Sequence, residues 1–129
     1  MSESMKAGPG SITWTDLTVD NAEEIRDFYS AVVGWEFEAV PMEGYDDYGM
    51  SEPGGGRTVA GICHARGVNA HLPPQWLMYI TVADIEESVR QCLAHGGQTL
   101  GDIRSLGGAG RFCVIRDPAG AVAALFQTT

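Results

Sequence analysis

The 129-residue sequence contains no long apolar run. No stretch approaches the roughly 20 apolar residues that a membrane-spanning helix needs. The polar first ten residues also lack the apolar centre of a secretory signal peptide. We therefore expect a cytoplasmic protein that has no membrane partner.

Basic side chains are scarce as well. Lys and Arg number 8 against 17 Asp and Glu, which gives a formal net charge of -9. Because nucleic-acid binding depends on basic side chains that displace counterions from phosphates, this balance argues against a nucleic-acid partner. An acidic run at residues 43–47 is expected to form a solvated loop.

Cysteine is limited to Cys63, Cys92 and Cys113, and no two of them form a C-x-x-C pair. This spacing excludes a disulfide framework and a zinc knuckle. We expect all three cysteines to be reduced and to pack as small apolar side chains.

What the sequence does contain is an internal repeat with a constant offset of 63 residues. Residues 12–35 resemble residues 75–98, and residues 59–62 match residues 122–125 without a gap. Self-similarity over most of a chain indicates a duplicated module. Each half predicts the element order β-α-β-β-β, so the expected fold class is α+β.

The individual elements follow from alternation, capping residues and turns. Asn21 with Glu24, and Asp84 with Glu87, predict capping boxes at the starts of two helices, and Gly34 is suited to end the first. The expected strands are residues 12–19, 35–40, 45–51, 58–65, 76–82, 98–102, 111–116 and 121–127.

The predicted organisation is one domain after a short leader. Residues 1–11 are polar and rich in Gly and Pro, and are expected to form a flexible leader. The domain then covers residues 12–129: the first module is 12–66, a linker is 67–74, and the second module is 75–129.

Two segments carry a family resemblance. Phe28-Tyr29 and Gly34-Trp35 follow a capped strand–helix junction, and Arg111-Phe112 precedes Asp-Pro-Ala-Gly at 117–120 and a last apolar strand. With the paired halves, this pattern resembles the vicinal oxygen chelate superfamily, which includes glyoxalases, bleomycin resistance proteins and extradiol dioxygenases. The resemblance implies a bacterial homodimer whose two tandem βαβββ modules form a curved, partly open eight-stranded sheet around a cavity.

The same resemblance locates the metal positions of the family. Metal-dependent members carry His, Gln or Glu at four equivalent places, which correspond here to Trp14, Gly61, Leu77 and Ala124. None of these side chains can coordinate a divalent ion. We therefore expect no metal and no other cofactor.

Strand alternation then predicts the lining of the cavity, since residues two apart share a face. The predicted ligand-binding residues are Trp14, Asp16, Cys63, Leu77, Tyr79, Ala124, Phe126 and Arg111. This set is mainly apolar and aromatic and suits a small organic ligand. An alternative is that Trp14 fills the space, so that these residues form a packed core.

Other side chains have two interpretations each. Asp16 is expected to be exposed, paired or shifted in pKa, with Arg111 or a phenol as its partner. An aromatic set forms either a ligand wall or core; its members are Trp35, Tyr45, Tyr48 and Trp76.

Three functions are compatible with this pattern. The first is a metal-independent protein of the glyoxalase and bleomycin-resistance type that binds a small molecule. The second is an enzyme in which Asp16 and Tyr79 act as acid and base. The third is a metal-dependent lyase, isomerase or dioxygenase with relocated ligands among Asp16, Cys63 and His64.

Overall fold

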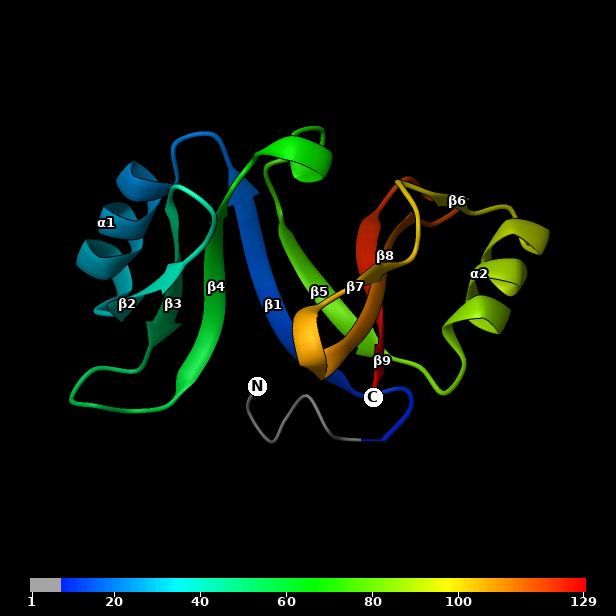
Figure 1. Ribbon diagram of the computed structural model, residues 1–129, viewed down its shortest axis with the longest axis horizontal. Coiled ribbons are helices and arrows are strands. Elements are labelled where there is room, and N and C mark those ends of the chain that lie inside the picture. The colour runs from blue at the N-terminus through cyan, green and yellow to red at the C-terminus, as the bar shows by residue number, and fades with distance from the viewer. Residues whose placement is uncertain (1–7) are drawn as a thin grey trace. The chain divides into compact units, whose positions relative to one another are not determined.

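The structure is a computed structural model that describes residues 8–129. Within these residues it contains two α-helices and nine β-strands in two successive β-α-β-β-β arrangements, the second with one additional strand (Figure 1). The predicted α+β class is confirmed. Neither helix is long and apolar enough to cross a membrane.

One compact unit consists of Thr15–Trp76. Its sheet has the order β2–β3–β4–β1, in which β1 (Ile12–Val19) pairs in parallel with β4 (Thr58–His64). Strands β3 (Asp46–Ser51) and β2 (Glu36–Pro41) continue it in antiparallel pairs.

Helix α1 (Ala22–Val33) packs on one face of this sheet, because its first residue and its inward-facing side chains are apolar. The buried residues of this core are Leu17, Val19, Ala22, Tyr48, Met50, Ala60 and Ile62.

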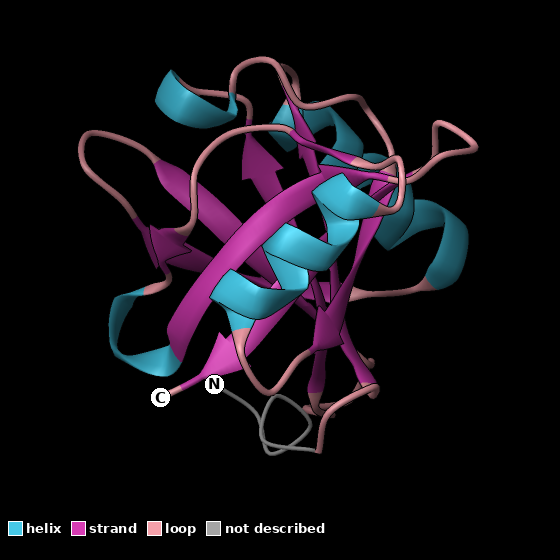
Figure 2. Ribbon diagram, turned by 90° about the vertical axis from the view of Figure 1, so that its right-hand side faces the viewer, coloured by secondary structure: helices cyan, strands magenta, loops and turns pink. Residues whose placement is uncertain are grey.

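The second compact unit consists of Leu77–Thr129 together with the described residues up to Trp14. Strand β9 (Val122–Thr128) pairs in parallel with β5 (Trp76–Thr81) and antiparallel to β8 (Gly110–Arg116). Helix α2 (Ile85–Ala94) lies across these strands, over a core of Ile85, Cys113 and Leu125 (Figure 2).

The strand expected at residues 98–102 is replaced by two shorter ones, which raises the strand count from eight to nine. Strands β6 (Gln98–Thr99) and β7 (Arg104–Ser105) both pair with β8. Between them Gly101 has a φ of 119°, a backbone conformation that interrupts a strand and that only glycine adopts readily.

The register of the parallel strands repeats the sequence offset. Asp16 is paired with Gly61 in one unit, and Tyr79 is paired with Ala124 in the other. Asp16 and Tyr79 are 63 positions apart in the sequence, and so are Gly61 and Ala124. The repeat recognised in the sequence is therefore a repeat of strand pairing.

The helix ends agree only in part with their predicted caps. Gly34 ends α1 with a φ of 80°, and the Asp84 side chain accepts a hydrogen bond from the Glu87 backbone N–H at 3.1 Å. Asn21 makes no such side-chain cap; its amide donates to the Glu24 carboxylate at 3.0 Å instead. At the start of α1, a hydrogen bond between the Asn21 and Glu24 side chains thus replaces the predicted capping of a backbone N–H.

Residues 1–7 of the expected leader lie outside the described part of the chain. Gly10 donates its backbone N–H to the Thr81 carbonyl at 2.7 Å, and Thr81 donates to the Ser11 carbonyl at 2.9 Å. The last two residues of the expected leader, Gly10 and Ser11, are therefore paired with the end of β5 through backbone hydrogen bonds. Within the expected linker, Gly67–Asn69 form one turn of 3-10 helix.

Candidate functional site

Each sheet has a distal face, defined here as the face opposite its packed helix. Leu17 and Ile62 pack toward α1, so Asp16 and Cys63 project from the distal face of the Thr15–Trp76 sheet. By the same alternation, Leu125 packs toward α2, and Ala124 and Phe126 project from the distal face of the other sheet. Most of the predicted ligand-binding residues thus lie on distal faces.

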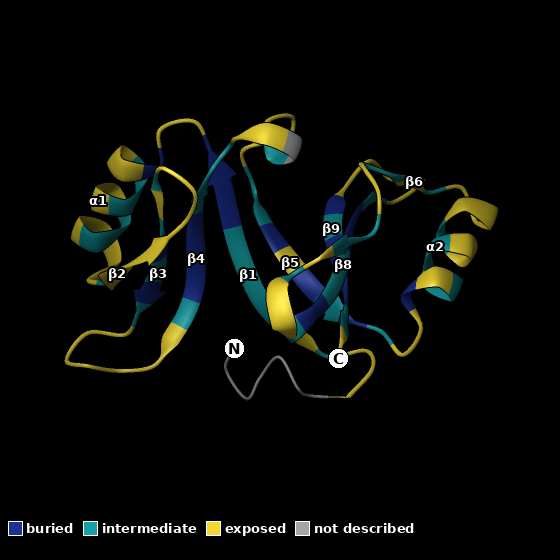
Figure 3. Cartoon of the chain, viewed as in Figure 1, coloured by how far each residue is buried: buried dark blue, intermediate teal, exposed yellow. Residues whose placement is uncertain are grey.

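Strands β5 and β9 of the Leu77–Thr129 unit are largely buried (Figure 3), and the residues at the centre of its distal face are apolar. Leu77 and Tyr79 are 1% and 6% exposed, and Ala124 and Phe126 are both 0% exposed. The ring of Phe112 lies 6.2 Å from that of Tyr79. These four side chains are therefore packed as core in the single chain, and Phe112, which is partly exposed, is the aromatic side chain of this face that solvent reaches.

The distal face of the Thr15–Trp76 unit is more polar. Burial raises the pKa of the Cys63 thiol strongly, and the negative charges of Asp16 and Asp47 raise it further. Since the thiolate is the form that attacks electrophiles and binds metals, Cys63 is protonated and unreactive at neutral pH. Other polar side chains of this face are those of Asp16 and Asp47, whose charges act on the Cys63 thiol.

Asp47 is not part of a solvated loop, which corrects the expectation for residues 43–47. Its Oδ1 accepts the backbone N–H of His64 at 2.9 Å and lies 3.3 Å from His64 Nδ1, and the two side chains are only 13% and 18% exposed. The physical reason is that β3 already begins at Asp46, so Asp47 is a ladder residue opposite Val40.

The predicted aromatic set separates into two clusters. Tyr45 and Tyr48 surround the His64 ring, with ring centroids 5.4 and 6.1 Å away. Trp35 and Trp76 instead contact Tyr29, whose hydroxyl accepts the Trp76 indole N–H at 3.2 Å. Both Trp35 and Trp76 pack against the α1 core, so these two side chains are structural.

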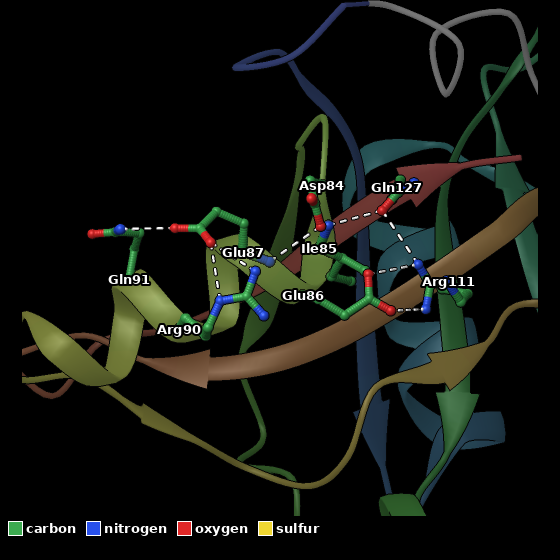
Figure 4. Close-up of polar contacts among 8 residues, drawn as sticks. All are labelled: Asp84, Ile85, Glu86, Glu87, Arg90, Gln91, Arg111 and Gln127. Atoms are coloured by element: carbon green, nitrogen blue, oxygen red, sulfur yellow. Dashed lines mark hydrogen bonds and ion pairs between the residues drawn. The ribbon is translucent and has the colours of Figure 1, made fainter.

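Arg111 projects toward α2 (Figure 4). Its guanidinium forms a two-pronged ion pair with the Glu86 carboxylate, with the longer contact at 2.9 Å, and it also contacts the Gln127 side-chain oxygen at 3.4 Å. Arg111 alternates with Phe112, which lies on the distal face. The sequence suggested Arg111 as a partner of Asp16; in the structure it holds the start of α2 to β8 and β9.

Comparison with known proteins identifies the family. The model of the glyoxalase/bleomycin resistance protein/dioxygenase superfamily matches residues 11–125. The chain belongs to this superfamily. The expectation from the sequence motifs is thereby confirmed.

Individual relatives agree with this assignment. The chain is 31% identical over 119 residues to CFP32 of Mycobacterium tuberculosis (strain CDC 1551 / Oshkosh), which is named as a glyoxylase. It is 26% identical over 131 residues to the anthracycline biosynthesis protein DnrV of Streptomyces peucetius. Both matches cover 92% of this chain but only 46% and 47% of the relative, so the chain spans about half the length of these relatives.

Solved structures share the fold at lower identity. Methylmalonyl-CoA epimerase from Mycobacterium tuberculosis aligns with a TM-score of 0.56 and 16% identity, over 95% of this chain and 92% of that one. A superfamily member from Vibrio splendidus 12B01 aligns with a TM-score of 0.57 and 14% identity, over 88% and 96% of the two chains.

The four positions that the family resemblance assigns to metal ligands carry side chains that do not fit a metal. Indole, hydrogen, isobutyl and methyl side chains stand at Trp14, Gly61, Leu77 and Ala124, and none of them is a ligand for a divalent ion. Across residues 8–129, no three His, Cys, Asp or Glu side chains gather in a group suited to hold a metal ion.

Two arginines on the distal face of the Leu77–Thr129 unit were missed by sequence reasoning. Arg116 is two residues from Val114, which pairs with Ala124, and Arg104 pairs with Phe112. The position of Arg116 could have been predicted from the sequence. It belongs to the predicted strand 111–116, and alternation along that strand places it on the same face as Val114. Arg104 gave no such signal, since the strand that contains it begins only after Gly101.

Proposed function

We propose that this chain is a cytoplasmic, metal-independent member of the superfamily that binds a small organic ligand. The observation that carries this proposal is the chemistry of the four metal positions, where no side chain offers a donor atom to a divalent ion. The partly exposed ring of Phe112, which lies 6.2 Å from that of Tyr79, supports an organic ligand with an apolar part.

Elemental analysis tests this proposal directly. Purified protein is incubated with nickel, zinc, manganese and iron, excess metal is removed, and the bound ions are counted by mass spectrometry. We expect far less than one ion per chain. A metal-dependent member of the superfamily, treated in parallel, is the positive control. One tightly bound ion per chain would instead indicate a metal-dependent lyase, isomerase or dioxygenase.

A second candidate function is metal-independent acid–base catalysis by Asp16 and Tyr79. These residues occupy equivalent places of the repeat, opposite Gly61 and Ala124. A carboxylate and a phenol are suited to move a proton in opposite directions. Once a converted substrate is found, Asp16→Asn should abolish turnover and retain binding, whereas the exposed Asp46→Asn should leave both unchanged.

The proposed oligomer is a homodimer. Every residue of β2 is exposed, and among residues 8–129 this strand pairs only with β3. A free sheet edge favours association with another strand. Sedimentation equilibrium should give twice the 13.8 kDa chain mass, and a mass of one chain would contradict the dimer.

A further inference from the structure

Arg104 and Arg116 differ from the other arginines of the described chain in their surroundings. Four arginines have a carboxylate within 4 Å, and they are Arg26, Arg57, Arg90 and Arg111. Arg66 lies over the ring of Tyr45. Within residues 8–129, no carboxylate reaches ion-pair distance of Arg104 or Arg116. This is unexpected in a chain with 17 acidic residues for 8 basic ones.

The strand register places Arg104 and Arg116 at positions on the same face of the same sheet, and the Arg104 guanidinium lies beside Gly101. Arg116 is paired with Val122 of β9, and Arg104 is paired with Phe112 of β8. Directly paired residues of an antiparallel ladder share a face. Ile103, the neighbour of Arg104, packs into the α2 core, which places Arg104 on the opposite, distal side.

The two arginines flank the apolar part of this face. Phe112, opposite Arg104, and Arg116 are four residues apart on β8, which corresponds to about 13 Å along a strand. Val114 lies between them and is paired with Ala124. The register therefore sets two arginine positions along one face that includes the ring of Phe112, with the Arg104 guanidinium beside Gly101.

Both side chains are also half-buried. A partly desolvated cation that lacks a carboxylate partner is stabilised when an anion joins it. Guanidinium groups form paired, charge-assisted hydrogen bonds with carboxylate and phosphate oxygens.

We propose that Arg104 and Arg116 form an anion subsite, which binds the carboxylate or phosphate of an organic ligand whose apolar part lies against Phe112. This inference rests on the proposed ligand-binding function and adds the charge class of the ligand. The net charge of -9 does not oppose such a subsite, because the only two arginines of the described chain without a carboxylate or aromatic partner share one face.

Isothermal titration with three probes of similar size tests the subsite. The probes are benzoate, phenyl phosphate and the neutral benzamide. We expect at least one of the anions to bind at least about tenfold more tightly than benzamide, and its affinity to fall as sodium chloride is added. The tighter of the two anions identifies the preferred group, carboxylate or phosphate.

Variants assign the binding to the two residues. Arg104→Gln and Arg116→Gln should each weaken the anion at least about tenfold, and Arg116→Lys should lie between Arg116→Gln and the unchanged protein, because it keeps the charge and loses the paired hydrogen bonds. The matched control is Arg57→Gln, a 77% exposed arginine that is not on this sheet. Far-UV circular dichroism verifies that each variant is folded.

Three outcomes would overturn the subsite: neither anion binds, benzamide binds as tightly as benzoate, or the arginine variants bind like the unchanged protein. If benzamide bound tightly and its affinity were the same in the Arg104 and Arg116 variants, the anion subsite would be contradicted. The proposed ligand-binding function would still hold. One bound metal ion per chain in the elemental analysis would contradict the proposed metal independence. The effect of the Arg104 and Arg116 substitutions on anion affinity could still be measured in that case.

Discussion

The Arg111–Glu86 ion pair shows how one residue controls the titration of another. Hydrogen bonds from Arg111 lower the pKa of the Glu86 carboxyl below its ordinary value. A carboxyl whose pKa is lower in the folded state adds stability above its unfolded pKa, and that stability is lost as the pH falls through the folded pKa. The contact is exposed, so its contribution to the free energy of unfolding is small.

We predict that Arg111→Gln returns the pKa of Glu86 toward the ordinary value. Carbon-detected NMR titration of the glutamate carboxyls measures this shift. The matched control is Arg90→Gln, which should act mainly on Glu87. The pKa of the Glu87 carboxyl is lowered first by the hydrogen bond from Gln91 and then by Arg90, which donates to that carboxylate at 2.7 and 2.9 Å. An unchanged Glu86 titration in Arg111→Gln would show that the ion pair is absent in solution.

Cys63 provides a second prediction at this scale. Because burial and the charges of Asp16 and Asp47 raise the pKa of its thiol, iodoacetamide at pH 8 should alkylate Cys63 at least about 100-fold more slowly in the folded protein than in urea. Peptide mass spectrometry measures both rates at each of the three cysteines. Equal rates at Cys63 would mean that the thiolate forms readily and that Cys63 is available for chemistry.

Single residues were predictable where the repeat and the alternation act together. That Ala124 and Phe126 share a face with Tyr79 follows from the offset of 63 residues and strand alternation. Whether this face lines a cavity or forms core was left open by the sequence, and in the single chain Ala124 and Phe126 are fully buried. Asp47 was mistaken for solvated because neighbouring charges are normally exposed, and its hydrogen bonds to His64 join residues 17 positions apart. No local pattern predicts that contact.

At the scale of elements, the two repeat-equivalent helix caps form a natural comparison. Asp84 accepts the Glu87 backbone N–H, whereas the Asn21 side chain contacts only the Glu24 carboxylate. Replacing a capping side chain with alanine removes the partner of a helix N–H and typically costs about 1 kcal/mol. Asp84→Ala should therefore lower the free energy of unfolding by about 1 kcal/mol.

Asn21→Ala is the internal control and should cost less than half as much as Asp84→Ala. Urea denaturation followed by circular dichroism measures both values. Equal losses would mean that Asn21 caps α1 in solution as the sequence predicted. The sequence located both helices because their apolar spacing and Gly34 are local signals, but whether Asn21 turns toward the helix depends on the competing carboxylate of Glu24.

At the scale of the whole molecule, the compact units do not coincide with the repeats of the sequence. The boundary between the units falls at Trp14–Thr15 and again at Trp76–Leu77, within strands β1 and β5. The sequence repeat indicates where pairing patterns recur. It does not indicate how residues are distributed between compact units, because that depends on contacts between distant segments such as Gly10 and Thr81.

Because β1 and β5 each contribute residues to both units, we predict that the protein unfolds in a single cooperative transition. Ile62 and Leu125 are equivalent by the repeat and belong to the separate cores under α1 and α2. Ile62→Ala and Leu125→Ala should each cost about 2–4 kcal/mol. Urea unfolding is followed by far-UV circular dichroism, which reports both units, and by tryptophan fluorescence. Fluorescence is recorded with every variant built on Trp14→Phe, because Trp14 belongs to the other unit and only Trp35 and Trp76 of the Thr15–Trp76 unit then remain.

The decisive variant is Leu125→Ala, whose altered side chain lies outside the unit that contains Trp35 and Trp76. In a cooperative protein, the fluorescence midpoint falls together with the circular dichroism midpoint, since loss of one core removes residues that the other unit needs for its strands. If the fluorescence midpoint stayed at the value of the unchanged protein while circular dichroism showed an earlier step, the units would unfold independently. In that case the shared strands β1 and β5 would not couple the two halves of the duplication.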